Sequence, residues 1–164
     1  MITTILIDDL FVSKKECKNL IEIYSSNKNL AHKHKSSPHS YIYPLDLAKH
    51  RIPETDFIKN KLNEIARHKN AVIDYFQIVK WPTGSELPLH LDVAKDNTIL
   101  TSILYLNNDY EEGETYLGEG TIIKPQVGRV IFFDGCYYRH GVKPIKKGTR
   151  FVIPAWYKKL DPSL

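Results

Sequence analysis

The sequence predicts one mostly β domain, an antiparallel jelly roll (double-stranded β-helix) with two helices packed on its outside. Two amphipathic helical patterns come first, many short strand-like runs follow, and turn residues separate those runs. A chain of 164 residues suits one substantial core and is short for two domains. We therefore expect a single domain over 1–164, with helical support over about 1–70 and the jelly-roll core over about 71–157.

The elements before residue 70 follow from capping and periodicity. Residues 2–11 are interrupted by two aspartates and are typical of a strand, not of a signal peptide. Ser13-Lys14-Lys15-Glu16 is a capping box, and Cys17, Leu20, Ile21 and Tyr24 follow at helical spacing, which predicts a helix from about Lys14 to Asn27. The polar stretch 31–43 reads as a loop, and 54–68 as a second amphipathic helix.

Beyond Ala71 the pattern changes to short strands separated by turn signals. Turns are expected at 82–84, 107–109, 118–120, 125–128 and 146–148. The strands expected between and beside them are 71–81, 89–93, 98–106, 115–117, 121–124, 129–133, 139–143 and 151–157.

His90-Leu91-Asp92, with His140 later in the chain, is the motif that carries the chemistry. Two imidazoles and one carboxylate are the ligands of the facial triad that holds non-haem Fe(II) and leaves open positions. In a strand, residues i and i+2 point to the same face, so His90 and Asp92 can hold one ion while a second strand supplies His140. The alternative is a chance H-x-D in a chain with seven histidines, and a surface His140 beside Gly141.

Arg150 follows the second histidine in an otherwise apolar strand-like run. A cation in such a place indicates a fixed anionic partner, because a buried charge without one is costly. A solvated charge at a strand end is the alternative.

These residues together resemble the prolyl 4-hydroxylase-like branch of the 2-oxoglutarate and Fe(II)-dependent dioxygenases, over roughly 74–157. The matching segments are the strand and turn 77–84, the "YLN" strand 102–107, the "GGET"-like turn 112–115, and the segments 127–133 and 139–142. The chain departs from the family at Trp81, where a tyrosine is usual, so that hydroxyl contact is expected to be lost. It also has Glu112 in place of the first glycine of the turn.

The resemblance implies the cofactors and their residues. Fe(II) would be bound by His90, Asp92 and His140. The cosubstrate 2-oxoglutarate would be bound by Arg150, Tyr105 and Trp156, and O₂ and ascorbate, as the reductant, would complete the set. The implied reaction hydroxylates an unactivated C–H bond and converts 2-oxoglutarate to succinate and CO₂.

The resemblance points to prolyl residues of a peptide or protein as the substrate. The loops 31–51 and 84–88 would then supply the lid. The candidate aromatic contacts are Tyr41, Tyr43, Trp81, Tyr137 and Tyr138.

Two other functions are compatible with these residues. A nucleic-acid demethylase of the same superfamily would use the same triad and Arg150. Such enzymes usually have an arginine where this chain has Trp156, and no dense basic stripe accompanies the net charge of +4, so we expect no nucleic-acid partner. A non-catalytic binding domain of the same fold would have no need of all four functional residues.

Composition adds weaker expectations. Hydrophobic residues make up 42% of the chain and no apolar run approaches the length of a membrane span, so we expect no membrane association. Two cysteines far apart, Cys17 and Cys136, give no disulfide framework. A reducing, cytoplasmic location is the expectation, and it also suits a ferrous site.

Overall fold

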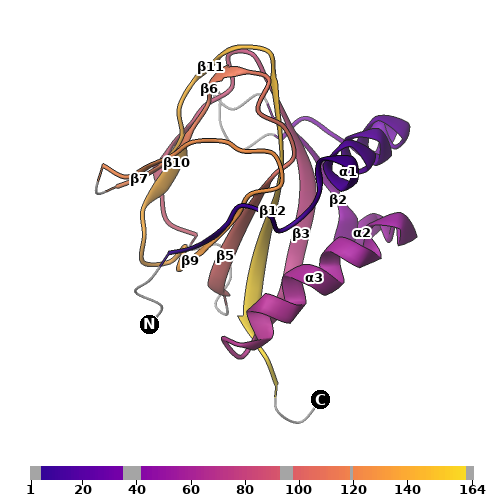
Figure 1. Ribbon diagram of the computed structural model, residues 1–164, viewed down its shortest axis with the longest axis vertical. Helices are drawn as coiled ribbons and strands as arrows, with labels where there is room; N and C mark the ends of the chain where they lie inside the picture. The colour runs from indigo at the N-terminus through magenta and orange to yellow at the C-terminus, as the bar shows by residue number, and fades with distance from the viewer. Residues whose placement is uncertain (1–4, 35–41, 93–97, 119, 162–164) are drawn as a thin grey trace.

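A computed structural model describes residues 5–34, 42–92, 98–118 and 120–161 of the chain. Three helices lie on one side of a set of long strands, and the shorter strands curl over on the other side (Figure 1). Within these ranges, no helix is long and apolar enough to cross a membrane.

Both predicted helices are present and close to their expected bounds. Helix α1 spans Lys14–Ser26, and its capping box is formed in full, with Ser13 and Glu16 each accepting a backbone N–H of the other residue. Helix α3 spans Asp56–Arg67 and is preceded by a 3₁₀ turn, η2 (Pro53–Thr55), whose proline supplies the fixed φ of a first turn. A 3₁₀ turn η1 (Lys28–Leu30) and a short helix α2 (Leu47–His50) complete the helical part.

The strands form two main antiparallel sheets. A six-stranded sheet has the order β1-β9-β5-β12-β3-β2, a four-stranded sheet the order β4-β10-β7-β8, and β6 pairs with β11. The bounds are β1 Leu6–Asp8, β2 Tyr43–Asp46, β3 Ala71–Pro82, β4 Leu87–His90, β5 Thr98–Tyr105, β6 Glu111–Glu112, β7 Thr115–Leu117, β8 Ile122–Ile123, β9 Val130–Phe133, β10 His140–Val142, β11 Ile145–Lys147 and β12 Thr149–Lys159. The mostly β jelly-roll prediction is confirmed.

The long strands separate two hydrophobic clusters by simple alternation. On β12, Ile153 belongs to an outer cluster that also contains Leu20 of α1 and Leu62 of α3. Val152, the neighbour of Ile153, belongs to an inner cluster that also contains Val142 of the four-stranded sheet. The helices therefore cover the outer face of the large sheet, and the space between the two sheets is left for the site.

Several expected boundaries were wrong. The strand expected over 89–93 is β4, which ends at His90, because pairing with β10 reaches only as far as His140 opposite His90. Part of the expected loop 31–43 contributes to β2, which pairs with β3, and 146–147 continue β11 instead of forming a turn. Short elements such as β2, β6, β11 and α2 carry too few residues to show a periodicity.

Candidate active site

His90 and His140 face each other across two antiparallel strands. They are directly opposed in the β4–β10 pairing, and their ring centroids lie 4.4 Å apart. One ligand atom from each of His90, Asp92 and His140 lies within 4.8 Å of the other two. A single ion can therefore touch all three side chains, and the donor set is that of a facial non-haem iron centre.

Both histidine rings are held in the same tautomer by the same local bond. His90 Nδ1 lies 3.0 Å from the Pro88 carbonyl, and His140 Nδ1 lies 3.0 Å from the Tyr138 carbonyl. A carbonyl oxygen only accepts, so each Nδ1 carries the proton and each Nε2 keeps its lone pair. The Nε2 atoms lie 3.7 Å (His90) and 3.5 Å (His140) from the Asp92 carboxylate.

Asp92 reaches the site from a loop, and the expectation that it alternates with His90 in one strand was wrong. The chain leaves β4 after His90, and the Asp92 N–H donates to the Gly135 carbonyl at 2.9 Å. The Thr101 hydroxyl donates to Asp92 Oδ2 at 2.6 Å, and the Trp156 indole also hydrogen-bonds the carboxylate. A Cβ at position 135 would overlap Asp92 and Thr101, so this contact requires glycine.

The electrostatics of the cluster favour the protonation states that bind metal. Burial acts to raise the pKa of Asp92, but the charge of His140 in its protonated form and the hydrogen bonds from Thr101 and Trp156 hold that pKa below its ordinary value. Burial, and then the neighbouring His140, lower the pKa of His90. A carboxylate that stays ionised beside an imidazole that stays neutral is the state that a cation needs.

Arg150 lies between the two sheets, with only 1% of its surface exposed. Its guanidinium carbon lies 5.1 Å from the Trp81 ring centroid and 5.6 Å from that of Tyr105, and Nη2 donates to the Thr115 hydroxyl at 3.1 Å. Within the described residues, Nε and Nη1 have no hydrogen-bond partner. A buried cation with unsatisfied donors fits the carboxylate of a ligand, because isolated charges are not tolerated in such surroundings.

The two other expected cosubstrate residues have partners within the protein. Tyr105 is buried beside Arg150, and its hydroxyl donates to Thr115 at 2.6 Å. Trp156 stacks on Tyr75 at 5.4 Å and bonds Asp92. The indole therefore supports the metal ligand Asp92.

The expected substrate contacts divide by face. Tyr41 lies outside the described residues. Tyr43 packs against the outer cluster and its carbonyl accepts the Tyr24 hydroxyl. Trp81 is buried beside Arg150. Tyr138 adjoins the metal cluster through its bond to His140, and its ring packs edge-on against Tyr137 at 5.1 Å.

The sequence reasoning missed Thr101, Thr115 and Tyr110. Thr115 lies in the "GGET"-like turn, so the motif marked the position but did not indicate what its side chain does. Thr101 and Tyr110 carried no local signal, since Thr101 acts through Asp92 in the preceding loop and Tyr110 through Arg150, far along the chain.

The chain belongs to the 2OG-Fe(II) oxygenase superfamily, whose family model matches residues 76–158. That match contains all three proposed ligands and Arg150. The mostly β fold, the ligand cluster and the unsatisfied arginine all fit membership of this superfamily.

Curated relatives include prolyl 3-hydroxylases. Chicken (Gallus gallus) prolyl 3-hydroxylase 1 is 41% identical over a 69-residue alignment that covers 38% of this chain and 9% of that protein. Human prolyl 3-hydroxylase 2 is also 41% identical, with 38% and 10% covered. The alignments thus span about a tenth of the length of the relatives.

Solved structures share the fold over nearly the whole chain. The viral collagen prolyl hydroxylase of Paramecium bursaria Chlorella virus 1 superposes with a TM-score of 0.76 at 22% identity, covering 94% of this chain and 95% of that one. A Pseudomonas putida prolyl-4-hydroxylase gives 0.77 at 14%, with 94% and 92% covered. A Trichoplax adhaerens prolyl hydroxylase, solved with a hypoxia-inducible factor peptide, gives 0.81 at 15%, with 94% and 83% covered.

Proposed function

We propose that this protein hydroxylates prolyl residues of a peptide or protein in a reaction that needs Fe(II), 2-oxoglutarate and O₂. The observation that carries the proposal is the combination of a two-histidine, one-carboxylate cluster with a buried arginine whose Nε and Nη1 have no partner among the described residues. A metal site alone fits many reactions, whereas the second, anion-binding feature fits a dicarboxylate cosubstrate.

Each residue has a defined task in this proposal. His90, Asp92 and His140 would hold the iron, and Arg150 would hold the distal carboxylate of 2-oxoglutarate. With these groups bound, the centre supplies oxidation: one oxygen atom enters a substrate C–H bond, and the other enters the succinate formed with CO₂ from 2-oxoglutarate. The inner cluster surrounds Arg150 with apolar side chains, which exclude water and strengthen its attraction for the carboxylate.

The substrate class rests on the relatives and on one local feature. The similar proteins are described as prolyl hydroxylases. Beside the metal cluster, Tyr137 is 52% exposed and packs edge-on against Tyr138. Exposed aromatic rings beside a reactive centre suit an extended proline-containing segment, which aromatic-lined grooves commonly bind.

The first experiment is succinate formation from 2-oxoglutarate with Fe(II), ascorbate and air. A proline-rich peptide is compared with the same peptide carrying alanine in place of every proline. We expect stimulation by the first peptide only, with one added oxygen on proline by mass spectrometry. Chromatography of the hydrolysed peptide then separates 3-hydroxyproline from 4-hydroxyproline.

Asp92→Ala is the matching variant, and it should abolish turnover while the protein stays folded, because the ion loses the only anionic ligand found among the described residues. Asp74→Ala removes a carboxylate that pairs with Lys158 at 3.1 Å, far along the chain from the metal motif, and should leave turnover intact. Normal activity of Asp92→Ala would contradict the metal assignment. Succinate formation that no proline peptide stimulates would contradict the substrate class.

A further inference from the structure

The space around Arg150 contains an unusual excess of hydrogen-bond donors. Trp81 Nε1, Tyr110 Oη, and Nε and Nη1 of Arg150 are buried, and none has a hydrogen-bond partner in the part of the chain that the structure describes. Buried polar atoms are normally satisfied, so four unsatisfied atoms around one arginine point to a ligand.

We propose that Trp81 and Tyr110 bind the distal carboxylate of the cosubstrate together with Arg150, and that Tyr105 acts only as a positioning residue through Thr115. This inference rests on the proposed function, because it assumes that the ligand at Arg150 is a dicarboxylate. It replaces the family's expected tyrosine contact with an indole N–H and a second phenol.

The role of Tyr105 follows from counting the bonds of Thr115. The Thr115 oxygen accepts from the Tyr105 hydroxyl at 2.6 Å and from Arg150 Nη2 at 3.1 Å. Both lone pairs of this oxygen are then in use, and its own hydrogen is left to donate. Thr115 is thus oriented as a donor, and Tyr105, which also hydrogen-bonds Arg150, orients it.

Trp81 is placed by strand register. It lies directly opposite Arg150 in the β3–β12 pairing, with its ring centroid 5.1 Å from the guanidinium carbon. The ring face therefore supports the cation, while the N–H at the ring edge remains unbonded among the described residues. An indole N–H only donates, which suits a carboxylate oxygen.

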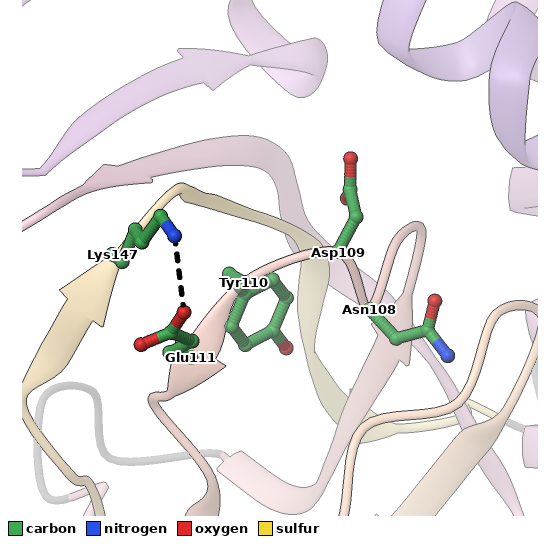
Figure 2. Close-up of a pocket in the computed structure, with 5 residues that line it drawn as sticks. All are labelled: Asn108, Asp109, Tyr110, Glu111 and Lys147. Carbon is green, nitrogen blue, oxygen red and sulfur yellow. Dashed lines mark ion pairs between the residues drawn. The ribbon is translucent and has the colours of Figure 1, made fainter.

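Tyr110 packs against the inner cluster from the segment just before β6. In Figure 2 its ring points the opposite way from the Asp109 side chain and away from the Lys147–Glu111 ion pair. Its buried hydroxyl lies within hydrogen-bonding reach of Arg150, whose charge also acts on it. The pocket of about 260 Å³ that Tyr110 lines with its chain neighbours and Lys147 does not include Arg150 or Trp81. Burial raises the pKa of Tyr110 to about 12 while Arg150 acts to lower it, so the phenol stays a neutral donor.

Glu114 offers the competing explanation for Tyr110. Its Oε2 is also buried without a partner among the described residues, and its charge acts on the Tyr110 phenol. If Tyr110 bonded Glu114 in solution, removal of the phenol oxygen would leave ligand binding unchanged. The two arrangements therefore differ in a measurable quantity.

The test is calorimetric binding of 2-oxoglutarate to protein loaded with Mn(II), which is not consumed in turnover. Trp81→Phe and Tyr110→Phe should each weaken binding by about tenfold or more, because each removes a hydrogen bond to a charged group. Trp81→Tyr should recover most of the loss, since it differs from Trp81→Phe by one hydroxyl. Mn(II) affinity itself should not change.

Tyr24→Phe is the matched control, because the Tyr24 hydroxyl bonds the Tyr43 carbonyl on the helical side of the large sheet. It should bind 2-oxoglutarate as the unmodified protein does. Wild-type protein should also prefer 2-oxoglutarate to its 5-carboxamide, because an amide NH₂ would face donors only.

Three results would overturn the proposal. Equal losses of 2-oxoglutarate affinity in Trp81→Phe and Trp81→Tyr would show that Trp81 contributes packing only and donates no hydrogen bond to the ligand. If Trp81→Phe and Tyr110→Phe bind 2-oxoglutarate with unchanged affinity while Arg150→Ala abolishes binding, neither Trp81 nor Tyr110 donates to the ligand. The proposed function would still hold in that case. No binding of 2-oxoglutarate by the unmodified protein would contradict the proposed function together with the inference.

Discussion

At the scale of single residues, the metal ligands depend on groups that never touch the ion. The two histidines are oriented by backbone carbonyls two residues earlier in the chain, so their tautomers are fixed locally. Asp92 has no such local support and depends on Thr101 and Gly135 from other parts of the chain. Its position is therefore the most sensitive part of the site.

Thr101→Val should weaken metal binding by roughly 10–100-fold, because it removes the hydroxyl that orients the Asp92 carboxylate while keeping the side-chain shape. Mn(II) affinity by calorimetry measures the effect. Thr83→Val serves as the control, since its hydroxyl bonds the Gly148 carbonyl on an exposed turn and should leave Mn(II) affinity unchanged. Equal affinities in the two variants would show that Asp92 needs no support from Thr101.

At the scale of elements, the turn at β6 shows how the chain accommodates its departure from the family pattern. Glu112 adopts a φ of +60° and Gly113 a φ of +72°, next to a register shift in the β6–β11 pairing. A left-handed conformation costs an L-residue about 1–2 kcal/mol. A Cβ at Gly113 would approach Ile145 to 2.7 Å, so only the second position strictly requires glycine.

Glu112→Gly should raise the free energy of unfolding by about 0.5–1 kcal/mol, because relief of the left-handed strain exceeds the loss of the exposed ion pair with Lys146. Glu111→Gly removes an equivalent pair with Lys147, but Glu111 is not among the positive-φ residues of the described chain. That variant should be destabilised by about 0.5–1 kcal/mol. Urea denaturation of both proteins measures the difference, and shifts of the same sign would contradict the strain argument.

At the scale of the whole molecule, the large sheet serves two purposes at once. Its outer face is stabilised by α1 and α3, and its inner face carries Tyr105 and Arg150 toward the four-stranded sheet that carries the two histidines. The packing that supports the domain and the polar groups that bind ligands thus lie on opposite sides of the same strands. One consequence is that the buried site contributes to the pH dependence of folding.

The metal-free protein should lose stability as the pH falls below about 6.5. Burial and His140 lower the pKa of His90 in the folded protein below its ordinary value of 6.5. The unfolded chain therefore binds the proton more readily than the folded protein does. The contribution of neutral His90 to the free energy of unfolding is fully present above pH 6.5 and is lost as the pH falls below it. Asp92, whose pKa is also lowered, adds a further loss only below about 3.8. Urea denaturation between pH 7.5 and pH 5 measures the effect.

His90→Asn should show a smaller decline over that range, and a decline equal to that of the unmodified protein would assign the pH dependence to other groups. Added Mn(II) at about 100 times its dissociation constant should stabilise the unmodified protein at neutral pH by about 2.7 kcal/mol.

The sequence alone determined the features that depend on residues close together in the chain. The capping box placed α1, alternation placed β3, β5 and β12, and the residue types of His90, Asp92, His140 and Arg150 indicated the chemistry, because a ligand's identity is a property of its side chain. Only the tertiary structure decided which groups support them. Thr101 of β5 supports Asp92 in the loop after β4, and Trp81, Tyr110 and Arg150 come together from separate segments, so no local pattern records these contacts.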